Sequence, residues 1–235
     1  MDHFTIFQDF YRVIAEMTEE EIVSAISNGT YRETVEDVRR IFAEQGEKAA
    51  NEKKIELPEI TFSANYRGGR SNATLVKYLG YIVVDIDHQT QEALARILAL
   101  AKKCAHTRIA FISPKGMGLK IVVRVCRTDG TLPETIQEIE DFHHAAYHKI
   151  ASFYAQLCGV EVDTSGQDVS RTCLFFYDPD IYFNPDATAV IVEQPPMFFK
   201  SQKKKRASGK KKKTTAPDNN PLTEQVALNY HSSHA

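Results

Sequence analysis

Two aspartates follow a run of apolar residues in the stretch YIVVDIDHQT, residues 81–90. If residues 81–87 form a strand, its side chains alternate between two faces, so Asp85 and Asp87 point the same way, roughly 6–7 Å apart. Two carboxylates so placed repel each other unless a positive charge lies between them. The pair predicts either a site for a divalent cation such as Mg²⁺ or a strand that ends in water, with Asp87 capping a helix that begins near Gln89.

A second stretch, SPKGMGLK at residues 113–120, places two glycines and two lysines between apolar segments. Glycine lets backbone N–H groups turn toward an anion, and lysine supplies a point charge for phosphate. The spacing is not that of a Walker loop, and a strand instead of a helix follows Lys120. The stretch predicts either a phosphate-binding turn or an ordinary hairpin turn with solvated lysines. Its candidate ligand-binding residues are Ser113, Lys115, Gly116, Gly118 and Lys120.

A third stretch, GVEVDTSGQDVSRTCLFFYDPDIYFNP, spans residues 159–185. Alternation in VEVD predicts a short strand that ends at Asp163, and a strand end holds a carboxylate more firmly than the turn-forming residues before Asp168. If a third acid joins Asp85 and Asp87, this position favours Asp163 over Asp168, although an Asx turn at 163–166 is an alternative. Arg171, ahead of a buried strand, could pair with phosphate as a bidentate donor.

Other polar residues are weaker candidates. Arg67 and Arg70 in YRGGRSN are assigned loosely to a template strand or a nucleotide. His144 and His148 are four residues apart on a predicted helix and could share a metal, but packing or exposure to solvent is preferred. The remaining candidates for nucleic-acid binding form a basic cluster near the end of the chain: Lys203, Lys204, Lys205, Arg206, Lys210, Lys211, Lys212 and Lys213.

The formal charge of −2 conceals a charge asymmetry. Eight of the 29 basic residues lie in 203–213, whereas only two of the 31 acidic residues follow residue 200. Residues 1–200 therefore hold 21 basic and 29 acidic groups, a net charge of −8. An acidic body argues against a passive nucleic-acid-binding domain, which would present a basic face of its own. It is compatible with an enzyme whose acids hold metal.

The elements that must position these residues can be read from hydrophobic periodicity. Residues 18–52 predict two helices, with a capping box at Thr18 and Glu21 and a break at Asn28-Gly29. From residue 81 the predicted order is strand, helix, strand, strand, helix, strand. This is the βαββαβ plan of ferredoxin-like and RNA-recognition-like α+β folds, an antiparallel sheet with helices on one face.

The predicted hairpin at residues 111–123 joins two apolar strands through a few turn residues, so the strands must be antiparallel. Along the second of them, Lys120 and Val122 should face one side and Leu119 and Ile121 the other. This argues against haloacid dehalogenase-like phosphatases, which also carry an acid pair after a strand but have a parallel sheet. Their usual glycine after the second aspartate is also replaced by His88. The phosphatase is kept as a third, minor alternative.

The 235 residues predict one ordinary globular domain with appendages. We expect an N-terminal helical extension at 1–57, the main domain at 58–196, and a basic, disordered tail or linker at 197–235. The four cysteines are widely spaced, which disfavours a zinc ribbon or a disulfide framework. With no secretory signal and no apolar run that could span a bilayer, we expect a cytoplasmic protein without membrane contact.

Three motifs in this order resemble those of the archaeo-eukaryotic primase superfamily (primase-polymerases). With h for an apolar residue and x for any residue, they are hhhDhD, S-x-x-G-x-G-h-K, and h-D ahead of an arginine-containing strand. More closely, they resemble the primase-like, VirE N-terminal-like domains of bacterial mobile-element and phage replication proteins. The resemblance runs from about Pro58 to Pro185. It implies that Asp85, Asp87 and Asp163 are catalytic and hold Mg²⁺ or Mn²⁺, and that the 113–120 turn holds nucleotide phosphates.

The resemblance implies metal-dependent nucleotidyl transfer from nucleotide triphosphates on a single-stranded DNA template, in the replication of a mobile element or phage. An alternative is a catalytically degenerate module that binds nucleotide or nucleic acid. Retention of three acids favours the enzyme. Lys120, in place of the usual histidine, and the lack of a zinc-binding stem favour the module. PLTEQVALNYHSSHA at 221–235 looks like an interrupted helix, so a helicase or other replication domain in a longer chain is an expected partner.

Overall fold

The structure is a computed structural model that describes residues 2–164 and 166–193. Its helices are α1 (Glu19–Ser27), α2 (Arg32–Gln45), α3 (Glu47–Lys54), α4 (Gln91–Lys103) and α5 (Ile136–Cys158), with a short 3₁₀ helix η1 (Asn72–Thr74). Its strands are β1 (His3–Phe7), β2 (Val13–Thr18), β3 (Glu59–Thr61), β4 (Ala64–Tyr66), β5 (Leu75–Tyr78), β6 (Tyr81–Ile86), β7 (Thr107–Ile112), β8 (Leu119–Cys126), β9 (Cys173–Leu174), β10 (Tyr182–Phe183) and β11 (Val190–Ile191).

The central sheet is built around β8, which pairs antiparallel with both β6 and β7. The predicted helices after β6 and after β8 are present as α4 and α5, and the predicted hairpin of β7 and β8 is antiparallel. The parallel arrangement required by the phosphatase alternative is therefore not formed by these strands. At its other edge β7 pairs with β10, and the far end of β8 pairs in parallel with β11.

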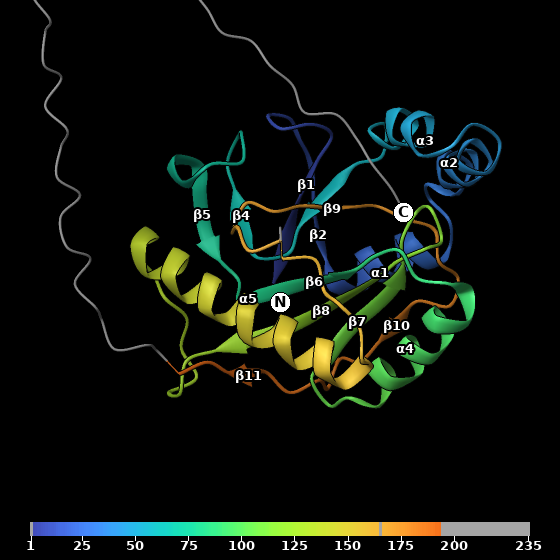
Figure 1. The fold of residues 1–235 in the computed structure, drawn as a ribbon. Coiled ribbons are helices and arrows are strands. Elements are labelled where there is room, and N and C mark those ends of the chain that lie inside the picture. The colour runs from blue at the N-terminus through green and yellow to red at the C-terminus, as the bar shows by residue number, and fades with distance from the viewer. Residues whose placement is uncertain (1, 165, 194–235) are drawn as a thin grey trace, which may run out of the picture. The chain divides into compact units, whose positions relative to one another are not determined.

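The two faces of the central sheet are covered by different layers (Figure 1). Ile82, Val84 and Ile121 lie in one apolar cluster with side chains from α4 and α5. Tyr81 and Val122 lie in a second cluster with side chains from β1, β3 and α1. Alternation along β8 is confirmed, because Leu119 and Ile121 share the first cluster while Val122 lies on the opposite face.

The N-terminal segment contributes strands as well as helices. The capping box of Thr18 and Glu21 is confirmed at the start of α1. Residues 1–57, predicted as a helical extension, also contain the β1–β2 hairpin, and β1 pairs with β3 across the predicted boundary at residue 58. The second sheet has the order β2-β1-β3-β9, and β4 pairs with β5 in a small separate sheet.

Two parts of the predicted plan differ from the structure, which is mixed α+β without a clear ferredoxin-like order. Residues 160–163 do not form a strand, since only the backbone N–H of Asp163 reaches β6, donating to the carbonyl of Asp85 at 3.1 Å. Of the predicted strand at 172–179 only β9 forms, and it pairs with β3 in the second sheet. The apolar character of this segment does not specify which strand it pairs with. Its proximity to β3 in the folded chain does.

The described residues, 2–164 and 166–193, all belong to one compact unit. The predicted tail at 197–235, with its basic cluster at 203–213, lies outside the described residues. Within the described part of the chain, no helix has the length and apolar character that crossing a membrane requires.

Candidate functional site

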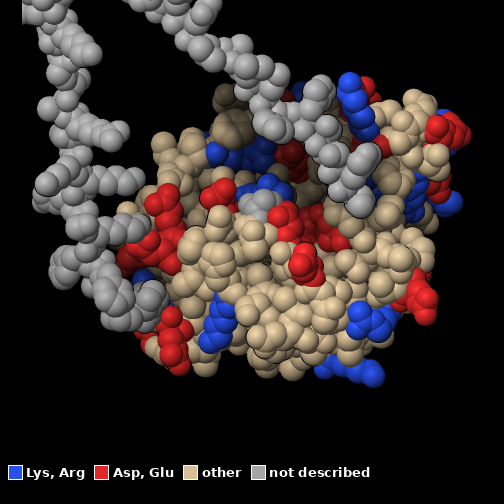
Figure 2. Space-filling model, viewed as in Figure 1, with Lys and Arg blue, Asp and Glu red and all other residues tan. Residues whose placement is uncertain are grey.

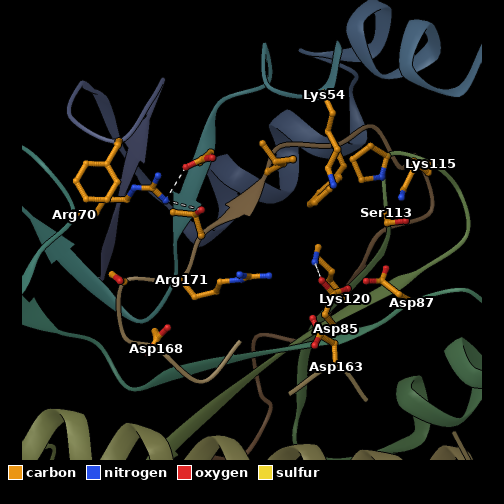
Figure 3. A pocket seen from close by; sticks show the side chains of 17 residues that line it. Lys54, Arg70, Asp85, Asp87, Ser113, Lys115, Lys120, Asp163, Asp168 and Arg171 are labelled. Carbon is orange, nitrogen blue, oxygen red and sulfur yellow. Dashed lines mark hydrogen bonds and ion pairs between the residues drawn. The ribbon is translucent and has the colours of Figure 1, made fainter. Parts of the chain in front are cut away.

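A cavity of about 470 Å³ opens between the central sheet and the second sheet. It is lined from below by side chains of β6 and β8 and from above by those of β3, β9 and α3, as Figure 3 shows for the labelled residues. Ten of its 17 lining residues are charged, and positive and negative side chains are equal in number. The basic residues are Lys54, Arg70, Lys115, Lys120 and Arg171, and the acidic residues are Glu59, Asp85, Asp87, Asp163 and Asp168.

Both signs of charge are visible at this hollow in Figure 2, where basic and acidic side chains face each other across its rim. A cavity of this volume lies within the range of small-molecule sites, which are usually mostly apolar. The balance of charges here instead suits a ligand that carries both an anionic group and a bound cation.

The centre of the cavity floor is an ion pair between Asp85 and Lys120. These residues are direct cross-strand partners on β6 and β8, and both side chains point toward the second sheet. The Lys120 ammonium donates to Oδ2 of Asp85, and the two side chains are 15% and 18% exposed. Burial acts to lower the pKa of Lys120, but its anionic neighbours, including Asp85 and Asp87, outweigh burial and raise it. The positive charge expected beside the acid pair is therefore supplied in this structure by Lys120.

One carboxylate oxygen of Asp85 is not used by the ion pair. Its Oδ1 is buried and has no hydrogen-bond partner among the described residues. A buried carboxylate oxygen without a partner is costly, and such atoms call for an explanation such as a bound ion. Asp85 can therefore bind Lys120 through one oxygen and offer the other to a cation.

Asp87 follows the end of β6 and also lines the cavity. It does not cap the next helix as one alternative predicted, because α4 begins at Gln91 and Thr90 accepts the backbone N–H of Ala93. Gly118 leaves room for the carboxylate. A Cβ at this position would lie only 2.6 Å from Oδ1 of Asp87 and 3.0 Å from the carbonyl oxygen of Ile86. Gly118 thus matters for the space it leaves beside Asp87.

The turn between β7 and β8 forms one rim of the cavity. Ser113 and Lys115 line it, whereas Gly116 and Gly118 do not. The turn is held internally by the backbone N–H of Ser113, which donates to the carbonyl of Gly118 at 2.8 Å. The predicted phosphate ligand Lys115 forms an ion pair with Glu47 of α3 at 2.5 Å.

Helix α2 fixes this turn from outside. Arg39 donates to the carbonyl of Pro114 at 3.0 Å and to the carbonyl of Tyr177 at 2.9 Å, so it ties the turn to the segment after β9. Asp178 is buried and accepts the backbone N–H of Ile112 at 2.8 Å. These contacts assign a positioning role to the N-terminal helices.

Lys54 is a cavity residue that the sequence analysis did not identify. It lies at the end of α3 and points into the cavity from the wall opposite Lys120 (Figure 3). Burial lowers its pKa, and the positive charges of Lys120 and Lys115 lower it further. A cation held among other cations gains from an anionic ligand. In the sequence Lys54 stands in a charged helix end, EKK, and nothing there separates it from solvated lysines.

Asp163, Asp168 and Arg171 come from one loop and all line the cavity. Asp163 is placed by its backbone N–H, and the hydroxyl of Tyr147 donates to its carbonyl oxygen. This replaces the predicted strand end as the reason for its position. Arg171 points into the cavity in Figure 3. In Figure 3 Asp163 lies beside Asp85 and Asp168 lies farther from it. The choice of Asp163 over Asp168 as third acid stays a prediction, because both residues line the cavity.

Arg70 and Arg67 lie on the loop between β4 and β5 but in different environments. Arg70 is largely buried in the cavity wall, where it contacts Glu59 at 2.8 Å and donates to Oγ1 of Thr172 at 2.7 Å. Arg67 is exposed and does not line the cavity. Arg70 is therefore part of the wall, while Arg67 is available to a ligand outside it.

The three-acid metal centre stays a prediction. Among the described residues, no group of three or more His, Cys, Asp or Glu side chains gathers closely enough to hold a metal ion. The donors do fit a smaller arrangement, because Mg²⁺ is often bound by one or two carboxylates together with phosphate oxygens. Asp85, with its unpartnered buried oxygen, and Asp87 on the same floor are suitable for it.

The histidines of α5 lie elsewhere. His144 and His148 are exposed, and their Nε2 atoms are 3.1 Å apart. Neither lines the cavity. The adjacent His143 is buried instead, with Nδ1 3.0 Å from the hydroxyl of Tyr78. Of the two outcomes preferred for this pair, packing or exposure, the structure shows exposure.

Comparison with known families gives one match. Residues 52–183 match a family model described as the BT4734-like, N-terminal domain, which covers more than half of the chain and every cavity-lining residue except Phe10. No curated protein and no solved structure matches the chain.

Proposed function

The chain belongs to the BT4734-like N-terminal domain family, a VirE-N/primase-like family of bacterial mobile-element proteins, and from that premise we propose that it catalyses metal-dependent nucleotidyl transfer. The substrates would be nucleotide triphosphates, added along a single-stranded DNA template. The observation that carries the proposal is the cavity in which the carboxylates of Asp85, on β6, and Asp87, just after it, lie among lysines and arginines from other segments of the chain.

The basic residues would bind the triphosphate. Lys54 and Lys115 lie on one side of the cavity and Arg171 points in from another side in Figure 3, so they can contact phosphates from more than one direction. Binding an anion beside Lys54 would remove the unfavourable interaction with its cationic neighbours. Lys120 would neutralise charge on the floor, either on Asp85 or on a phosphate that approaches it.

Asp85 and Asp87 would hold a divalent cation, Mg²⁺ or Mn²⁺, with phosphate oxygens as further ligands. When bound, the ion would stabilise the negative charge that develops on the attacking and leaving oxygens. In the reaction a 3′-hydroxyl attacks the α-phosphate, a new phosphodiester bond forms, and pyrophosphate leaves. The walls of the cavity orient the triphosphate for this displacement, and such positioning accounts for a large part of phosphoryl-transfer catalysis.

The test is template-dependent incorporation. The full chain is incubated with Mn²⁺ or Mg²⁺, labelled nucleotides and a single-stranded template, with and without a primer. Asp87→Asn should abolish incorporation, while Asp180→Asn, which changes an exposed acid outside the cavity, should not. Asp87 is preferred to Asp85 for this test because Asp85 is in an ion pair. A wild-type chain that incorporates no nucleotide with either metal would contradict the proposal.

A second candidate is a non-catalytic module that binds nucleotide or nucleic acid for a replication protein. It is favoured by the Lys120–Asp85 ion pair and by the lack of a three-ligand group in the described part of the chain. The module would bind nucleotide triphosphate with an affinity independent of Mn²⁺. The enzyme should bind it at least tenfold more tightly with the metal present, which calorimetry can measure. A helicase or another replication domain remains the proposed partner of either form.

A further inference from the structure

Two aromatic side chains are exposed at the tip of the β1–β2 hairpin. Phe10 is 46% exposed and Tyr11 is 75% exposed, and their ring centroids lie 4.9 Å apart with an interplanar angle of 74°. Ile14 on β2 is 44% exposed as well. Exposed apolar groups that cluster, in contrast to single ones, often mark an interaction site. We refer to Phe10 and Tyr11 as the aromatic tip.

The backbone of the tip is held in one conformation by its own hydrogen bonds. Oδ1 of Asp9 accepts the backbone N–H groups of Tyr11 at 2.8 Å and Arg12 at 2.9 Å. The N–H of Gln8 donates to the carbonyl of Arg12 at 2.9 Å and closes the turn. The two bonds from Tyr11 and Arg12 also lower the pKa of Asp9. The rings are therefore presented on an ordered turn, which reduces the entropy lost on binding.

A second loop supports the tip from beside it. The N–H of Arg70 donates to the carbonyl of Phe10 at 3.2 Å, and a Cβ on Gly69 would lie 3.2 Å from the ring of Tyr11. The Arg70 guanidinium lies over the ring of Phe10, with its Cζ 5.1 Å from the centroid. The exposed Arg67 belongs to the same loop. Glycine at position 69 thus permits the close contact between the loop and Tyr11.

The tip is continuous with the cavity. Phe10 and Arg70 line the cavity together with Asp85 and Asp87, and the ring of Tyr11 contacts that of Phe10. Arg12, which follows Tyr11 in the chain, and Arg67, on the loop that supports the tip, are both exposed. Exposed aromatic rings beside arginines are the combination that binds single-stranded nucleic acids, in which bases stack on rings and cations contact phosphates.

We propose that the aromatic tip is a stacking platform for unpaired bases of a single-stranded nucleic acid at the mouth of the cavity. The inference rests on the proposed function, because nucleotide addition requires the template strand to lie beside the bound nucleotide. Stacking accepts every base, which suits a template of arbitrary sequence. Arg12 and Arg67 would contact the phosphates of the same strand.

A protein partner is the competing occupant of such a surface. Arg12 beside the tip and Arg67 on the neighbouring loop favour a ligand with negative charge, and Phe10 also lines the charged cavity. A nucleic acid has both the negative charge and the aromatic bases that this surface can bind. Duplex DNA carries the same phosphates but keeps its bases stacked on one another. The proposal therefore predicts that the tip contributes to the binding of single-stranded DNA and not to the binding of duplex DNA or of a protein.

The experiment measures the affinity of the full chain for a labelled single-stranded oligonucleotide by fluorescence anisotropy over a series of salt concentrations. Phe10→Ala combined with Tyr11→Ala should weaken binding by about tenfold, the effect of losing stacking on roughly one base. The slope of log affinity against log salt should not change, since no phosphate contact is removed. Affinity for a duplex of the same length should remain within twofold of the wild type.

Three variants keep the result interpretable. Tyr11→Ala alone, at the more exposed position, should give part of the loss without any change in melting temperature. Replacing Tyr11 by Trp should retain the affinity, because a ring remains. Phe153→Ala, which removes a ring 40% exposed on α5 outside the cavity, should have no effect.

An affinity of the double variant within twofold of the wild type would overturn the proposal. Equal losses of affinity for single-stranded and duplex DNA would also overturn it. Unchanged DNA binding with altered self-association in ultracentrifugation would overturn it too, and would assign the tip to protein contact. The proposed function is tested separately by metal-dependent triphosphate binding to the wild-type chain. If that binding is absent but the single-strand effect is present, the platform stands and the enzyme does not.

Discussion

The two faces of the central sheet differ although the same strands build both. On the face toward α4 and α5, Ile82, Val84 and Ile121 are fully buried in a continuous apolar cluster. On the face toward the second sheet, the apolar cluster around Val122 gives way to the charged cavity where β6 ends and β8 begins. Charged residues and core residues thus alternate along one strand.

The difference shows how a pleated strand separates stability from ligand binding. Lys120 and Ile121 are adjacent in the chain, yet the first lies on the cavity floor and the second in the core. Side chains on opposite faces of a sheet share no contacts, so substitutions on one face should leave the function of the other largely unchanged. The predictions below test this separation.

The largest effect is expected at the Asp85–Lys120 pair. Asp85→Asn should abolish nucleotide incorporation. It should also lower the free energy of unfolding by about 3 kcal/mol, because the partly buried Lys120 loses its counter-ion. Combining it with Lys120→Met should restore stability but not incorporation, as measured by urea denaturation and the incorporation assay. If the double variant regains activity, Asp85 serves only to balance Lys120.

Truncation on the helical face should affect stability alone. Ile121→Ala should lower the free energy of unfolding by about 2–5 kcal/mol, because the side chain is fully buried and leaves a cavity behind. Affinity for nucleotide triphosphate, measured by calorimetry at a temperature where the variant is folded, should stay within twofold of the wild type. A tenfold loss of affinity would show that the two faces are coupled.

We expect the stability of the fold to decrease at acidic pH, and we expect a buried histidine of α5, His143, to contribute to this decrease in addition to the cavity. Burial lowers the pKa of His143 to about 3, whereas the unfolded chain should titrate near 6.5. Between these values the unfolded state binds the additional proton, so stability is present above about pH 6.5 and falls as the pH decreases. We expect a loss of about 2 kcal/mol between pH 7.5 and 5.

His143→Gln should remove this part of the pH dependence, whatever its effect on absolute stability. His144→Gln is the matched control, because His144 is exposed and adjacent on the same helix. Urea denaturation at the two pH values gives the difference directly. A slope in the His143 variant equal to that of the wild type would place the acid-sensitive group elsewhere.

The smallest effect is expected from crowding Asp87. Gly118→Ala would place a methyl group 2.6 Å from Oδ1 of Asp87, so the carboxylate must shift. Affinity for Mn²⁺ with nucleotide should fall about tenfold, as when the positioning of a metal ligand is disturbed. Gly46→Ala, at a position with φ of +85° and open space, should cost stability without this loss. Equal affinities in both variants would remove Asp87 from the binding site.

Local pattern was sufficient for the elements that carry the central site. Alternation placed Asp85 and Asp87 on one face, and apolar periodicity predicted α4, α5 and the antiparallel β7–β8 hairpin. These predictions depend on neighbours within a few residues, where steric rules and solvent exposure act directly. The order of the motifs also indicates a primase-like family, and the family match covers largely the same region.

Segments that contribute through distant contacts were missed. Phe10 and Lys54 reach the cavity from the β1–β2 hairpin and from α3, and Arg39 holds the 113–118 turn from α2. In the sequence each looks like an ordinary exposed aromatic or basic residue. The predicted strand at 160–163 also failed, because a strand needs a partner edge and only one backbone bond to β6 is made.

The sequence by itself determined which residues carry charge, which faces they share on each strand, and where the chain turns, since these follow from the side chains and from local backbone geometry. Three kinds of pairing depend on the tertiary structure: the register that sets Asp85 opposite Lys120, the partner of β9, and the meeting around one cavity of segments that range from Phe10 to Phe176. These depend on which apolar surfaces can be buried together across long separations, and no local pattern specifies that choice.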